Sequence, residues 1–250
     1  MNITGNNQKS VQKSAMSRQT EKLPSRPKPE SPTLALARLA FGIALCVVLN
    51  LLPTTLHAQT LTADLALQPA SPSIWKDGVG NGFRQDTFDA GFALGAGFGV
   101  LAFGGTVKHD LALASGNFGW VFSDVVAEDK WWRGNWEWLN EVFSGGQFSP
   151  RDHYFVGWTT GLRYNFATGS RWVPFIDGGV GLSVTDIDSP DLDGLFQFNV
   201  QAGVGTHYFF RDDTAVTVQY RWLHFSDGGT TAVNHGVNTQ MFEAGLTWFF

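Results

Sequence analysis

From Phe88 to the last residue, the chain alternates between large apolar side chains and small or polar ones. Between 88 and 100 the even positions are mostly Phe, Leu or Ala, and the odd positions up to 99 are mainly Gly. Successive side chains of a β-strand point to opposite faces, so this period of two predicts a strand with one apolar face. The pattern recurs at 156–166, 172–183, 196–205, 214–225 and 242–250, and less regularly near 109–122 and 132–143.

These strands would suit a soluble sandwich as well as a membrane barrel, and three features favour the barrel. The second face is rich in glycine as well as polar, the strands reach about ten residues, and aromatic residues gather near strand ends. Four tryptophans fit one such interfacial girdle: Trp131, Trp132, Trp136 and Trp138. No run after Ala58 reaches the roughly 18 apolar residues of a spanning helix. We therefore predict an all-β fold: an eight-stranded antiparallel transmembrane β-barrel of the bacterial outer membrane, over residues 88–250.

The connections between strands orient this barrel. Segments 167–170 and 211–213 are short and are predicted to be periplasmic, whereas 184–195 and 226–237 are long and are predicted to be extracellular. The chain ends on an apolar strand with Phe250 as its last residue. Such an ending resembles the signal by which bacterial outer-membrane proteins engage their assembly machinery, which we predict as a partner.

Residues 1–58 are predicted to be a signal peptide and leader. Seven Lys or Arg precede an apolar run at 39–52, and cleavage after Ala58 would follow. Translation starting at Met16 is an alternative, and Cys46, the only cysteine, is either a signal-peptide residue or a weak lipidation site. Residues 59–87 lack the alternation and are predicted to be a periplasmic lead-in.

The charge balance excludes one class of partner. The whole chain has a formal net charge of −5, and the basic leader leaves the rest of the chain at −10. Such acidity argues against a nucleic-acid partner. The sequence does not predict an oligomeric state.

A candidate site lies at the outer end of the strand over 214–225. His224 and Ser226 are two residues apart, so they share the outward, lipid-facing side. Asn238 begins the next, descending strand with outward parity, which places it beside His224. Serine, histidine and an orienting third group form the set that ester hydrolysis needs. The alternative interpretation is that these are ordinary interfacial residues near a loop.

The chain resembles the lipid A 3-O-deacylase (PagL) family from about Phe88 to Phe250. The resemblance rests on the runs Tyr220–Gly229 and Asn234–Asn238, with support from Gly161–Phe166 and Pro174-Phe175. It implies an outer-membrane hydrolase that removes the ester-linked 3-hydroxyacyl chain at position 3 of lipid A, without metal or cofactor. The implied partner is lipid A or lipopolysaccharide of the outer leaflet. The family's catalytic histidine and serine fall on His224 and Ser226.

Two positions depart from the family pattern. Asp227 stands where the family has an asparagine that helps hold the oxyanion, and Asn238 stands where the characterised form has a glutamate. An ionised Asp227 cannot donate to an oxyanion, so the oxyanion hole would use the N–H groups of Gly228 and Gly229, or a protonated Asp227. Asn238 can orient a neutral histidine but gives no countercharge, which Asp227 is a candidate to supply.

These departures leave two alternatives open. One is a non-catalytic barrel that binds lipopolysaccharide or has a structural role. The other is an esterase that acts on phospholipids of the outer leaflet.

Other polar residues carry weaker expectations. The spacing of Asp186, Asp188, Asp191 and Asp193 loosely resembles a calcium loop, although a solvated acidic loop is favoured. Gly95–Gly99 lies within a strand and is predicted to line the lumen, and Glu243 is expected to point inward. The remaining histidines are expected at turns or interfaces: His109, His153, His207 and His235.

Overall fold

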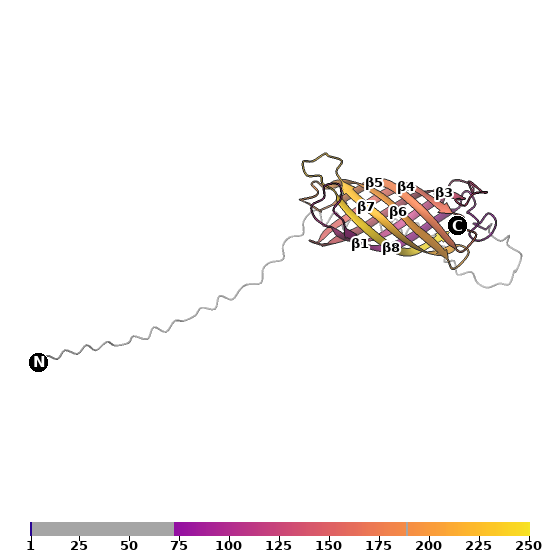
Figure 1. The fold of residues 1–250 in the computed structure, drawn as a ribbon, viewed down its shortest axis with the longest axis horizontal. Coiled ribbons are helices and arrows are strands. Elements are labelled where there is room, and N and C mark those ends of the chain that lie inside the picture. The colour runs from indigo at the N-terminus through magenta and orange to yellow at the C-terminus, as the bar shows by residue number, and fades with distance from the viewer. Residues whose placement is uncertain (2–72, 189) are drawn as a thin grey trace, which may run out of the picture. The chain divides into compact units, whose positions relative to one another are not determined.

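A computed structural model describes residues 73–188 and 190–250, besides Met1. In these residues eight antiparallel strands follow one another around a closed barrel (Figure 1). The strands are β1 (Phe88–Gly99), β2 (Asp110–Val121), β3 (Gly134–Ser149), β4 (His153–Phe166), β5 (Trp172–Thr185), β6 (Phe196–Phe209), β7 (Thr214–Ser226) and β8 (Val237–Phe249). The predicted fold class is confirmed. The predicted leader and the first part of the lead-in, 59–72, lie outside the described residues.

No helix among the described residues is long and apolar enough to span a membrane.

The strand faces follow the predicted parity. Large apolar side chains on the outer wall are exposed, such as Leu94 (63%) and Phe242 (60%), and all four tryptophans of the predicted girdle are exposed as well. Many inward positions are polar and buried, and buried apolar residues gather inside the two ends of the barrel. The inward Arg163 pairs with Asp177 at 3.0 Å, and the inward Arg221 pairs with Glu141 at 2.6 Å.

Two connections differ from the prediction. β3 continues to Ser149 instead of ending near 143, because Gly145 and Gly146 keep their pairing with β2 and β4 although they break the alternation. The connection after β3, at the end predicted to be extracellular, therefore has only three residues, 150–152. The connection 122–133, at the end predicted to be periplasmic, is long. Short connections are not confined to the periplasmic end.

Residues 73–87 close the end of the barrel that is predicted to be periplasmic. Trp75 is 2% exposed and stacks on Phe83, whose ring stacks in turn on Phe249 at 4.9 Å between centroids. The indole Nε1–H of Trp75 donates to the carbonyl of Asp212 at 2.7 Å. This part of the predicted lead-in is thus a packed plug, and the domain boundary at 87/88 stays a prediction.

Candidate functional site

His224 and Asn238 face each other across the β7–β8 hairpin. The strand register pairs the two residues directly, and both have the outward parity predicted for them. The Nδ1 atom of His224 lies 2.9 Å from Oδ1 of Asn238. Asn238 is only 2% exposed, because the connection between β1 and β2 covers it.

The environment of Asn238 fixes the orientation of its amide. Its Nδ2 donates to the carbonyl of Ala102 at 3.0 Å, and a carbonyl can only accept. The Oδ1 atom therefore faces His224 and accepts from Nδ1–H, which leaves Nε2 of the imidazole as the basic nitrogen. A carboxylate at position 238 would have no proton to offer Ala102. The carbonyl at position 102 thus accounts for an amide at 238.

Ser226 lies on the same outward side of β7 as His224, one strand repeat further out, and both side chains are partly buried. Two residues along a strand separate their Cα atoms by about 6.6 Å. No hydrogen bond joins Ser226 Oγ to His224 among the described residues, and apo structures commonly hold such pairs apart. A rotation of the serine and a bound substrate would have to complete the pair.

The carboxylate of Asp227 accepts hydrogen bonds from its own loop. One carboxylate oxygen accepts from the N–H of Gly229 at 2.7 Å, and the other accepts from the N–H (2.8 Å) and the hydroxyl of Thr231. The hydrogen bond from the Thr231 hydroxyl, with those of the two backbone N–H groups, lowers the pKa of Asp227 below its usual range, although partial burial opposes them. The carboxylate is therefore ionised. The geometry favours neither of the predicted roles of Asp227, oxyanion donor or countercharge.

The two glycines predicted as oxyanion donors differ in whether their N–H groups are already hydrogen-bonded within this loop. The N–H of Gly229 is already used by Asp227, whereas the N–H of Gly228 has no hydrogen-bond partner in the described part of the chain. Both residues have positive φ, at 69° and 83°, and both are exposed. Of the predicted oxyanion donors, Gly228 keeps a free N–H at the end of β7.

Three residues surround the imidazole of His224. The Trp222 ring stacks on it, with centroids 5.5 Å apart and planes inclined by 14°. Phe103 approaches edge to face at 5.9 Å. Gly236 lies so close that a Cβ there would meet Cε1 of His224 at 2.6 Å. Of these contacts, only the outward parity of Trp222 was visible in the sequence, because the other two come from loops.

Asp191 ties the outer loops together, which sequence reasoning missed. Its carboxylate is fully buried and accepts from Thr106 (hydroxyl at 2.6 Å and N–H at 2.9 Å), Val107 (N–H at 2.8 Å) and Nε2 of His109 (3.0 Å). Burial would raise the pKa of Asp191, but these hydrogen bonds together hold it below its usual range. Its carbonyl accepts from the N–H of Gly236 at 3.1 Å. The expectation of a solvated acidic loop is wrong at this residue, since the carboxylate is surrounded by donors.

The other polar predictions had mixed outcomes. His109 and His207 are buried, at 3% and 0% exposure, instead of lying at turns or interfaces, because both have inward positions near the barrel ends. Glu243 points inward as predicted and lies 3.5 Å from Arg221. The residues that the structure describes contain no cluster of His, Cys, Asp or Glu suited to a metal ion.

The fold and the site define the class: an outer-membrane β-barrel with a histidine–asparagine pair and a serine on its lipid-facing wall. Within that class, the model of the lipid A 3-O-deacylase (PagL) family matches residues 104–247, and the chain belongs to this family. The matched segment includes His224, Ser226 and Asn238. No curated protein sequence matches the chain.

Solved structures similar to this chain include outer-membrane barrels. The outer membrane enzyme PagL has 16% identity and a TM-score of 0.48, and the match covers 62% of this chain and 97% of that one. Neisserial surface protein A has 14% identity and a TM-score of 0.47, with coverages of 65% and 97%. Ail of Yersinia pestis has 9% identity and a TM-score of 0.43, with coverages of 66% and 99%.

Proposed function

We propose that this protein is a serine-type lipid A 3-O-deacylase, which hydrolyses the ester-linked 3-hydroxyacyl chain at position 3 of lipid A in the outer leaflet. The observation that carries the proposal is the hydrogen bond from Nδ1 of His224 to Asn238. It leaves Nε2 as the base on the side of the barrel that carries Ser226. Family membership supplies the substrate class.

In the proposed reaction, Ser226 Oγ attacks the ester carbonyl while its proton passes to Nε2 of His224. The tetrahedral intermediate collapses, and the imidazolium returns that proton to the sugar oxygen that leaves. Water then attacks the acyl-serine ester with the same base, which releases the hydroxy fatty acid and restores Ser226. Asn238 holds the imidazole in one tautomer through both halves of the reaction.

The oxyanion needs a donor other than the side chain at 227. The N–H of Gly228 is our candidate, because it follows the nucleophile by two residues and has no other partner in the described chain. Each such donor is worth roughly 2.7–4 kcal/mol of the activation barrier. A hole built only from backbone N–H groups is compatible with an ionised Asp227 that faces away into its loop.

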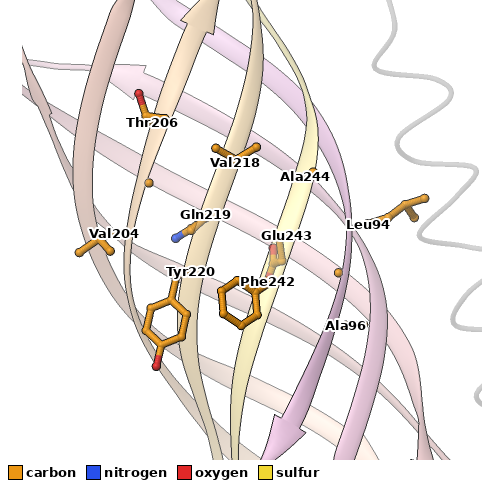
Figure 2. Close-up of a pocket in the computed structure, with 12 residues that line it drawn as sticks. Leu94, Ala96, Val204, Thr206, Val218, Gln219, Tyr220, Phe242, Glu243 and Ala244 are labelled. Carbon is orange, nitrogen blue, oxygen red and sulfur yellow. The ribbon is translucent and has the colours of Figure 1, made fainter.

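An apolar groove of about 700 Å³ on the outer wall suits the acyl chain (Figure 2). It runs over β1, β8, β7 and β6, and Tyr220 and Phe242 lie side by side in it with centroids 5.2 Å apart. Tyr220 is four residues before His224 on the same face of β7, a distance of about 13 Å along the strand. An acyl chain that extends from the site into the bilayer would lie along this wall.

The test offers the purified protein two substrates separately, in detergent micelles. We expect release of a 3-hydroxy fatty acid from hexa-acylated lipid A, no release from phosphatidylethanolamine, and no release by Ser226→Ala. A folded-state control is the slower gel migration of the heated barrel compared with the unheated one.

The other outcomes favour one of the two alternative functions or contradict the mechanism. Release of fatty acid only from the phospholipid would favour the outer-leaflet phospholipid esterase. Binding of lipid A without any release would favour the non-catalytic barrel. Release from lipid A that persists in Ser226→Ala would contradict the serine-type mechanism.

A further inference from the structure

The proposed reaction places a positive charge on His224 that no carboxylate neutralises. The ion pairs of the described histidines involve His109, His153 and His235, and none involves His224. Its Nδ1 partner is the neutral amide of Asn238. The nearby Asp227 is engaged with its own loop. In a low-dielectric wall, an imidazolium without a partner is costly.

Trp222 is the group placed to compensate. Its indole ring lies nearly parallel to the imidazole of His224, with an interplanar angle of 14° and a centroid separation of 5.5 Å. A cation within about 6 Å of an aromatic centroid is attracted to the ring face, and tryptophan gives the strongest attraction. Phe103 packs against both rings, at 5.8 Å from Trp222 and 5.9 Å from His224, which limits the access of water.

We propose that Trp222 is a positioning residue of the reaction, whose indole face holds the His224 imidazole and stabilises the imidazolium in place of a carboxylate. The inference rests on the proposed function, since it assumes that His224 takes a proton from Ser226. An interfacial tryptophan whose only role is to contact the membrane would not need to be parallel to a histidine ring. Trp158, also on the outer wall and 44% exposed, lies on β4 and provides that comparison.

An alkyl fluorophosphonate tests the inference without lipid A. Ser226 Oγ attacks phosphorus, the P–O bond forms, fluoride leaves, and the serine proton passes to Nε2 of His224. We expect the maximal labelling rate of Trp222→Leu to fall about 3- to 30-fold, with an unchanged half-saturating concentration. Trp222→Phe should fall less, because it keeps an aromatic face. Trp158→Leu should label at the rate of the wild type.

The same Trp222 substitution can also be measured in a protein that carries Asn238→Asp. Asn238→Asp places one carboxylate oxygen against Nδ1 of His224 and supplies a countercharge, while its other oxygen gives up the hydrogen bond to the carbonyl of Ala102. In that background, replacement of Trp222 by Leu should have a clearly smaller effect on the labelling rate, because the two stabilising groups act on one charge. An equal effect in both backgrounds would overturn the inference.

The remaining outcomes separate the two proposals. An unchanged labelling rate in Trp222→Leu, or a change only in the half-saturating concentration, overturns the role of Trp222. Labelling that depends on Trp222 while lipid A stays intact supports this inference and overturns the proposed substrate. A wild-type protein that is not labelled overturns both proposals.

Discussion

At the scale of single residues, the absence of a side chain at Gly236 lets the loop after β7 lie close to the imidazole of His224. Gly236 has a φ of 79°, and a Cβ at this position would lie 2.6 Å from Cε1 of His224, closer than side chains tolerate. Gly229 has a similar φ of 83° but open space where its Cβ would stand. An alanine at either position would therefore strain the backbone to a similar degree, but only an alanine at 236 would also press against the imidazole of His224.

We expect Gly236→Ala to displace the imidazole and to lower lipid A hydrolysis at least tenfold more than Gly229→Ala does. The pair is a matched control, since either alanine costs about 1 kcal/mol for positive φ. Initial rates of fatty-acid release by the two variants make the comparison. Equal losses would show that the contact with His224 is unimportant.

Asp227 gives a pH dependence with a defined sign. Its pKa is lowered in the folded protein, so its contribution to loop stability is present above the unfolded value of about 3.9 and disappears as the pH falls through the lower folded value. The N–H groups of Gly229 and Thr231 should lose protection from hydrogen exchange below about pH 4. In Asp227→Asn the loss should already be present at pH 7. Protection in this variant that still depends on acid would exclude Asp227 as the titrating group.

At the scale of elements, three outer loops meet at Asp191. The loop after β1 is held through Thr106 and Val107, and the loop after β7 is held through Gly236. The first loop also supplies Ala102 to Asn238, and the last one contacts His224. Asp191 thus supports both halves of the His224–Asn238 pair from a third loop.

We expect Asp191→Ala to raise hydrogen exchange at 102–107 by at least tenfold, because several hydrogen bonds to a buried charge are lost at once. A smaller rise is expected at 235–236, because these N–H groups donate to the main-chain carbonyl of residue 191, which alanine keeps but holds less firmly. Asp193→Ala is the control, since that side chain caps only Gly194 in its own loop. Mass-spectrometric exchange on the folded barrel measures both variants. An effect confined to 186–195 would show that Asp191 is not a link between loops.

The period of two was sufficient to predict the strands and the outward parity of His224 and Asn238. It was insufficient where pairing continues without alternation, as at Gly145 and Gly146. Loop contacts have no period at all, so the carbonyl of Ala102, the buried carboxylate of Asp191 and the closeness of Gly236 were not predictable. Residues on strands could therefore be predicted from the sequence, whereas the loop residues that hold them could not.

At the scale of the whole molecule, side chains fill both ends of the barrel, and the candidate site lies on its outer wall. The inward Arg221 lies between two buried carboxylates, Glu141 at 2.6 Å and Glu243 at 3.5 Å. An aromatic plug around Trp75 closes the end predicted to be periplasmic, and a buried cluster that includes Phe143, Phe155 and Phe225 fills the opposite end. Phe225 belongs to this cluster. Its buried side chain packs inside the barrel, on the opposite face of β7 from His224 and Ser226.

Replacement of Arg221 should lower the free energy of unfolding far more than replacement of an exposed arginine. Arg221→Leu leaves two buried carboxylates unpaired and should cost about 3–5 kcal/mol of unfolding free energy. Arg171→Leu breaks a solvent-exposed pair with Asp212 and should cost about 1 kcal/mol or less. Urea unfolding of the two variants in lipid vesicles, followed by tryptophan fluorescence, gives both values. Equal midpoints would contradict the importance of the lumen network.

The most direct test of the central claim is mass spectrometry of lipid A from a Gram-negative host that produces this protein. We predict loss of one hydroxyacyl chain, at position 3, in cells with the wild type, and intact lipid A in cells with Ser226→Ala or His224→Ala at equal amounts of folded barrel. Intact lipid A in all three, or the same loss in all three, would contradict the account.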